Sequence, residues 1–166
     1  MNKNKTIIVL FVLLSMVALL VPMVFAASQS PIVKQVTGGG WILAPVCTGN
    51  DAKKTFGFNA QELADGTVRG NVEYVDHFTG YPHVHGYEID TLTIVGNQAT
   101  ITGMCRLNGD PGPYAFTVVV RDVDEPGKHD WFEIHIPSIP YDAGAELGFD
   151  LEAGGGGNIQ IHIPAP

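Results

Sequence analysis

Three histidines lie close together between Asp76 and His85, and imidazole nitrogens are preferred ligands of zinc and copper. His83 and His85 are two residues apart, a spacing that puts both side chains on one face of a β-strand, and His77 lies a turn away. We therefore expect His77, His83 and His85 to be the candidate ligands of a zinc or copper ion. The competing interpretation is a set of exposed histidines that hydrogen-bond to neighbouring groups or to water.

A second set of acidic residues has the spacing of a calcium loop. Calcium prefers several hard oxygen donors around a turning backbone, which this segment offers. The fifth position of the loop is a proline and the flanking segments have the pattern of strands, so the competing interpretation is a solvated acidic hairpin. The loop positions one, three, six, nine and twelve are Asp122, Asp124, Gly127, Asp130 and Glu133.

Nucleophilic catalysis has no evident nucleophile in this sequence. The serines that follow the N-terminal segment are Ser28, Ser30 and Ser138, and none lies in a Gly-x-Ser-x-Gly turn. The glycine-rich runs lack the Gly-Lys-Ser/Thr ending of a phosphate loop. Paired carboxylates for glycoside cleavage stay open as an alternative, because two of the 17 acidic residues could converge in the folded chain.

Exposed aromatic residues are the third candidate site. A platform that contacts carbohydrate or protein could be formed by Trp41, Tyr81, Tyr87, Trp131 and Tyr141. We expect Phe132 and Ile134 on the interior face of their strand, so the alternation predicts that Trp131 points outward. The alternative is that these aromatic side chains fill or cap a β core.

The first 27 residues have the pattern of a secretory signal peptide. Lys3 and Lys5 precede an apolar run, and Ala26 and Ala27 are small residues that suit signal peptidase. A retained membrane anchor is the alternative, since about 20 apolar residues span a bilayer. We expect a secreted or cell-surface chain, with residues 28–36 as a short polar lead and residues 37–166 as a single β domain.

Charge and cysteine content limit the possible partners. Without the signal, 17 acidic residues face seven basic ones, so the net charge is -10, and such a surface repels nucleic acid and anionic lipid. Cys47 and Cys105 are the two cysteines of the chain, and outside the cell an even count predicts a disulfide. That bridge would close a loop worth roughly 3 to 4 kcal/mol and would leave no thiolate for catalysis or zinc binding.

The elements that must position these residues are β-strands. Apolar and polar residues alternate from Trp41 onward, turn signals recur at close intervals, and no stretch has a capped helical period. We expect an all-β antiparallel meander of about eight or nine strands, with a barrel favoured over a sandwich. A change of phase between His83 and Val95 predicts a bulge near Asp90-Thr91, with Tyr87 and Ile89 on one face.

The alternation also predicts the core, and the glycine runs predict where the chain ends meet. Gly38–Gly40 and Gly154–Gly157 permit a close backbone approach between the first and last strands. The expected core residues share the inward face of their strands. They are Val68, Gly70, Val72, Tyr74, Ala99, Ile101, Gly103, Cys105, Tyr114, Phe116, Val118, Val120, Phe132, Ile134, Ile136, Ile159, Ile161 and Ile163.

Six motifs resemble the post-COAP domain family and span essentially the whole chain after the signal. The resemblance implies a secreted β-rich module, of a kind often found at the C-terminal end of larger cell-surface proteins, and it implies no activity. The histidine-rich segment around His83 is not a feature of the family. The motifs are Thr37–Ile42, Lys54–Phe58, Ala99–Gly109, Tyr114–Phe116, Asp130–Ile134 and Gly156–His162.

These observations predict a secreted, non-catalytic β module with a binding or structural role at the cell surface or outside the cell. Its expected partner is an extracellular protein or a glycan. One alternative is an extracytoplasmic metal-binding protein that uses calcium, zinc or copper. The other is a small barrel enzyme, which a deep pocket lined by convergent polar residues would indicate.

Overall fold

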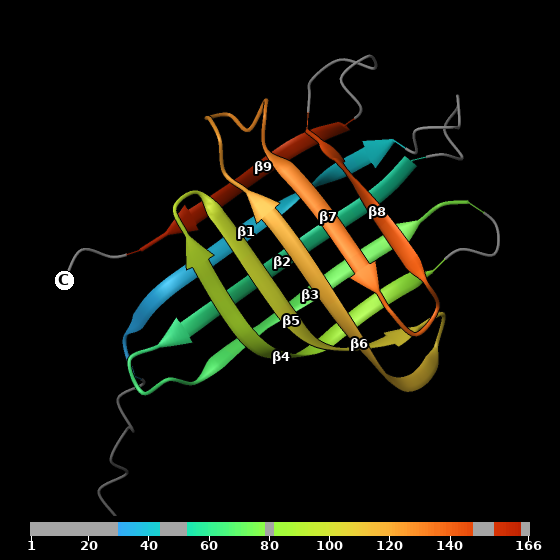
Figure 1. Cartoon of the computed structure of the whole chain (residues 1–166), viewed down its shortest axis with the longest axis horizontal. Coiled ribbons are helices and arrows are strands. Elements are labelled where there is room, and N and C mark those ends of the chain that lie inside the picture. Colours follow the sequence, from blue (N-terminus) through green and yellow to red (C-terminus); the bar gives the residue numbers. More distant parts are fainter. Residues whose placement is uncertain (1–29, 44–52, 79–81, 148–154, 164–166) are drawn as a thin grey trace, which may run out of the picture.

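The computed structural model describes residues 30–43, 53–78, 82–147 and 155–163, so the segment expected to be a signal peptide lies outside the described residues. The described chain is all-β, and its nine antiparallel strands form one sheet that curls into a nearly closed barrel (Figure 1). The predicted meander and its strand number are confirmed. The strands are β1 (Ile32–Leu43), β2 (Lys53–Leu63), β3 (Val68–Asp76), β4 (His83–Val95), β5 (Gln98–Leu107), β6 (Asp110–Arg121), β7 (Trp131–Ile136), β8 (Tyr141–Glu146) and β9 (Gly155–His162).

The first eight strands pair in sequence order, and β9 returns to pair with β1. The two outer strands of the sheet are therefore β8 and β9, and the barrel has its seam between them. The first strand begins at Ile32, inside the stretch expected to be a polar lead. No helix in the part of the chain described is long and apolar enough to cross a membrane.

The barrel interior is filled by the inward side chains that the alternating pattern predicts. Phe56 and Phe132 stack at its centre with ring centroids 3.9 Å apart. The expected core is confirmed for most positions, including Phe116, Val118 and Ile134. Ile163 is an exception, with 60% of its surface exposed. It lies one residue beyond the end of β9, where the chain has left the barrel wall.

Strand β4 contains two irregularities where the sequence predicts one. Its register against β5 shifts between Ile89 and Thr91, which confirms the predicted bulge, and it shifts a second time between Gly86 and Glu88. The extra shift turns Tyr87 to the outside, with 39% of its surface exposed, while Ile89 is buried. The expectation that these two side chains share a face is therefore wrong, because a second inserted residue reverses the phase between them.

Glycines allow β1 and β9 to lie against each other, as the two glycine runs predict. A Cβ atom at Gly40 would lie 2.2 Å from the carbonyl oxygen of Gly156, far inside van der Waals contact. Gly157 has a φ of +144°, and a Cβ atom there would lie 2.3 Å from the carbonyl oxygen of Gly39. Side chains at these positions would push the first and last strands apart.

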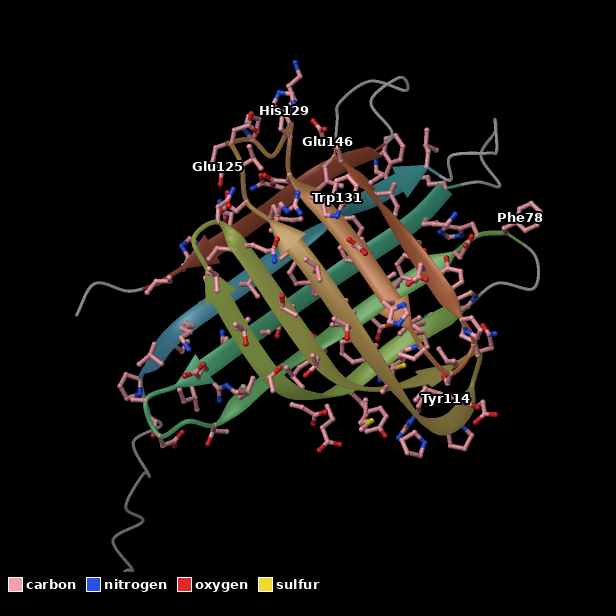
Figure 2. All side chains as sticks on the ribbon, viewed as in Figure 1. Phe78, Tyr114, Glu125, His129, Trp131 and Glu146 are labelled. Carbon is pink, nitrogen blue, oxygen red and sulfur yellow. The ribbon has the colours of Figure 1, made fainter. Side chains whose placement is uncertain are left out.

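The connections define two ends of the barrel. One end carries the segment before β4, the β5–β6 turn and the β7–β8 turn, and we call it the pocket end (Figure 1). The opposite end carries the β2–β3 and β4–β5 turns and the β6–β7 connection, and we call it the seam end. Figure 2 shows Tyr114 at the pocket end, whereas Glu125, His129 and Glu146 gather at the seam end.

Candidate functional site

A pocket of about 500 Å³ opens at the pocket end of the barrel. This volume is in the range that takes a small organic molecule. Three connections that are distant in sequence supply its wall, so the pocket exists only in the folded barrel. Its lining combines apolar, aromatic and polar side chains, and it consists of Pro82, Leu107, Asn108, Asp110, Tyr114, Ile139 and Tyr141.

The hydroxyl of the pocket residue Tyr141 takes part in a buried hydrogen-bond network. The Tyr141 hydroxyl donates to Oδ2 of Asp76 at 2.6 Å. Its oxygen lies 2.6 Å from the Tyr74 hydroxyl, which donates to it because the single Tyr141 proton is already used. Nζ of Lys54 lies 3.3 Å from the same Asp76 oxygen, and the backbone N–H of Phe78 donates to the other oxygen at 3.0 Å.

The pKa values of the two tyrosines are raised above their usual range. Burial raises the pKa of Tyr141 far above its usual range, and the hydrogen bond to Asp76 raises it further. Burial also raises the pKa of Tyr74. Both hydroxyls therefore stay protonated at neutral pH and act as fixed donors, not as bases. Tyr141 presents a side chain of fixed orientation to the pocket.

The sequence contains a local signal for this network, which none of the predicted sites includes. Lys54 alternates in phase with Phe56 on β2, and Asp76 alternates in phase with Tyr74 on β3. The two charged residues face each other across the β2–β3 ladder and are only 7% and 6% exposed. A charged residue in phase with a buried apolar face indicates a paired interior charge, because an unpaired one is too costly to bury.

The predicted histidine site comes together only in part. His83 and His85 lie on the outer face of β4 around Glu73 of β3. Nε2 of His83 is 3.5 Å from one Glu73 oxygen, and Nδ1 of His85 contacts the other. His77 is separate from them, because its Nε2 lies 3.1 Å from the Thr55 hydroxyl on β2. The two histidines at strand spacing do share a face, as predicted.

Two of the predicted calcium ligands, Asp130 and Asp122, accept backbone N–H groups of β9 at the barrel seam. Oδ2 of Asp130 accepts the backbone N–H of Ile159 at 2.7 Å, and its Oδ1 accepts that of Val123 at 2.8 Å. Oδ2 of Asp122 accepts the N–H of Ile161 at 2.8 Å. These carboxylates occupy the outer edge of β9, where a closed barrel would have a backbone ladder.

The other two predicted calcium ligands point elsewhere. Oδ1 of Asp124 accepts the backbone N–H of His129 at 3.2 Å, and Nδ1 of His129 lies 2.6 Å from Oε1 of Glu146. Glu133 accepts the indole N–H of Trp131 at 3.3 Å on the outer face of β7. Within the described ranges, no group of three or more His, Cys, Asp or Glu side chains is arranged to hold a metal ion.

The aromatic residues predicted as a binding platform do not lie together. Trp131 is on the outer face of β7, as predicted, with the Arg121 guanidinium 5.9 Å from its ring centroid. Tyr87 is on the outside of β4, with Arg106 5.1 Å from its ring centroid. Strands β5 and β6 separate the two aromatic rings. Tyr81 lies outside the described residues.

Cys105 lies on the inner face of β5 and is fully buried. Burial raises the pKa of its thiol to about 11, so as a thiol it is protonated at neutral pH and is neither a nucleophile nor a metal ligand. Its expected partner, Cys47, lies outside the described residues, so the disulfide stays a prediction.

The pocket and its supporting network form the candidate site of the described chain. It combines a cavity with a buried ion pair and shifted pKa values, which together indicate a functional site. Comparisons of the chain with protein-family models, with curated proteins and with solved structures found no match.

Proposed function

We propose that this protein is a secreted, non-catalytic binding module whose end pocket takes a small molecule. The observation that carries the proposal is the pocket of about 500 Å³. Tyr141 forms part of its wall, and the hydroxyl of this tyrosine is hydrogen-bonded to Asp76. Binding sites need a few polar groups of fixed position within a largely apolar cavity. The Tyr141 ring has a fixed position because Asp76 and Tyr74 hold its hydroxyl, and Asn108 and Asp110 supply polar groups to the same pocket.

Binding is better supported than catalysis. The Asp76 carboxylate has three partners, so its oxygens are already engaged within the protein. The raised pKa of Tyr141 excludes a tyrosinate base at neutral pH. Cys105 is buried and, as a thiol, is protonated, and Ser30 is used in a hydrogen bond to Asp65. The described polar groups therefore position a ligand and lack an activated nucleophile.

The proposed location follows from the N-terminal sequence, and the resemblance to post-COAP modules supports the same location. We expect the exported chain to begin after Ala26 or Ala27. N-terminal sequencing of the protein collected outside the cell tests this directly. A chain that keeps its first 27 residues in the cytosol contradicts it.

A pocket-filling variant tests the binding role. Ile139 lines the pocket and is 41% exposed, so Ile139→Trp should fill the cavity without disturbing the core. Val95→Trp is the matched control, because Val95 is 72% exposed next to the β4–β5 turn at the seam end. A calorimetric screen of cationic, neutral and anionic small molecules should find ligands that bind the wild type and Val95→Trp but not Ile139→Trp. Binding that Ile139→Trp retains in full places the ligand elsewhere.

A further inference from the structure

We infer that the end pocket selects an organic ammonium cation, a compact positively charged amine with an apolar body. The inference rests on the proposed binding function and names its ligand class. Three features of the lining carry it: one carboxylate, two tyrosines and the absence of a cationic side chain among its seven described residues.

Asp110 supplies the negative charge. It lies at the start of β6, exposed at the pocket wall, and its Oδ1 accepts the backbone N–H of Gly112 at 2.9 Å. A hydrogen bond to Asp110 is also the main cause that raises the pKa of Tyr114. These contacts orient the Asp110 carboxylate and leave accepting capacity for a ligand, since an ionised carboxylate has about four lone-pair positions.

Tyr114 and Tyr141 supply aromatic surface beside that carboxylate. The face of a tyrosine ring carries partial negative charge, and quaternary ammonium groups bind well among such faces. Tyr141 is held by its bond to Asp76, so it need not lose conformational freedom when a ligand enters. A carboxylate next to two tyrosines suits a cation in which methyl groups surround the charge.

The charges around the pocket disfavour an anionic ligand. The buried cation Lys54 is neutralised by Asp76, and the Arg106 guanidinium, next to the pocket residue Leu107, lies over the Tyr87 ring on the outer face. His83, next to the pocket residue Pro82, turns its ring to Glu73 on the outer face of the barrel. The whole chain carries a net charge of -8, which attracts cations and repels anions at low ionic strength.

A neutral sugar fits less well, because most acceptors of the pocket are already engaged. The side-chain oxygen of Asn108 accepts the backbone N–H of His83 at 2.8 Å. The Tyr141 hydroxyl is bonded to Asp76 and Tyr74. A polyol that buries several hydroxyls would leave some of them without partners, which costs binding free energy.

The test compares choline with its neutral isostere 3,3-dimethylbutan-1-ol by isothermal titration calorimetry at low ionic strength. The two molecules have the same shape, and only choline is charged. We expect choline to bind the wild type about tenfold more tightly or better, because an ion pair and cation–π contacts depend on the charge. Asp110→Asn should weaken choline binding about tenfold. Asp90→Asn, an exposed change of equal charge on β4, should alter it less than twofold.

Two outcomes overturn the inference and are distinguishable from failure of the proposed function. If the isostere binds as tightly as choline and Asp110→Asn has no effect, the pocket binds by shape and its preference for cations is wrong. If neither compound binds while a sugar or an organic acid binds the wild type and fails to bind Ile139→Trp, the ligand class is wrong and the binding role stands. If no compound of any charge binds, both proposals fail. Circular dichroism of each variant checks that the fold is retained.

Discussion

Removal of the Asp130 carboxylate should open the barrel seam and destabilise the fold. Asp130 is fully buried, and its two oxygens accept the backbone N–H groups of Val123 and Ile159. Asp130→Ala removes both acceptors at once. The Ile159 N–H is buried and costs about 1 to 3 kcal/mol when it is left without a partner, whereas the Val123 N–H is only partly buried and costs less. We therefore expect a total of about 3 kcal/mol.

A loss of this size is easily measured. For a domain of this length, 1 kcal/mol corresponds to roughly 3 to 5 °C, so the Tm of Asp130→Ala should fall by about 10 °C. Asp122→Ala is the control, because Asp122 accepts one backbone N–H and is only partly buried. It should cost about 1 kcal/mol. Urea unfolding gives the free energies, and hydrogen exchange of the Ile159 amide reports the seam directly.

The pH dependence of this effect has a definite sign. Burial raises the pKa of Asp130, and the bonds from Val123 and Ile159 only partly oppose that rise. The folded pKa therefore lies above the unfolded value near 3.8, so the part of the stability that comes from protonation of Asp130 is fully present below pH 3.8 and is lost as pH rises through its folded pKa, while the hydrogen bonds from Val123 and Ile159 persist at pH 7. The difference in stability between wild type and Asp130→Ala should be larger at pH 3.5 than at pH 7.

Two results would refute this reasoning. The first is a free energy of unfolding for Asp130→Ala within about 0.5 kcal/mol of the wild-type value, which is the range of an ordinary surface substitution. The second is a hydrogen-exchange rate of the Ile159 amide that is the same in the variant as in the wild type. Either result means that the β9 edge does not depend on the Asp130 carboxylate. Asp130→Asn separates charge from shape, since it keeps one acceptor and should be milder than Asp130→Ala.

Three further predictions follow from the described contacts. Gly40→Ala should destabilise the fold by about 1 to 3 kcal/mol in urea unfolding, since its methyl group meets a carbonyl oxygen of β9, whereas Gly57→Ala, with no atom within 4 Å, should stay close to the wild type. Tyr141→Phe should lower stability by about 1 to 3 kcal/mol, because a buried tyrosine and a buried aspartate lose their shared partner, and a Tm equal to that of the wild type contradicts this. A non-reducing digest should contain a linked peptide of Cys47 and Cys105, and recovery of both as free thiols contradicts the disulfide.

The alternating pattern predicts the fold well because it records which side of each strand faces the core. A period of two places Phe116 and Val118 inside without any knowledge of their partners, and both are buried. The same pattern is ambiguous where it breaks. At β4 a single phase change is compatible with one or with two bulges, and only the pairing with β5 shows that Tyr87 leaves the inner face.

The candidate site was harder to predict, because its residues act through partners that are distant in sequence. Asp130 has the spacing of a calcium ligand, yet one of its partners, the Ile159 amide, lies 29 residues further along the chain. Local spacing identifies a residue type suited to an ion, but it does not show which N–H groups the fold brings to the same carboxylate. Tyr141 and Asp76 are likewise 65 residues apart.

The seam and the pocket are separate enough that their energetics should be independent. Asp110 begins β6, and Asp122 directly follows its last residue, so this 12-residue strand separates them by a contour of roughly 40 Å at about 3.3 Å per residue. Substitutions that share no partner and lie more than about 10 Å apart usually have additive effects. Asp130→Ala should therefore lower the Tm and leave choline affinity unchanged. Asp110→Asn should weaken choline binding and leave the Tm unchanged. A loss of affinity in Asp130→Ala at a temperature where it is fully folded would mean that the seam controls the shape of the pocket.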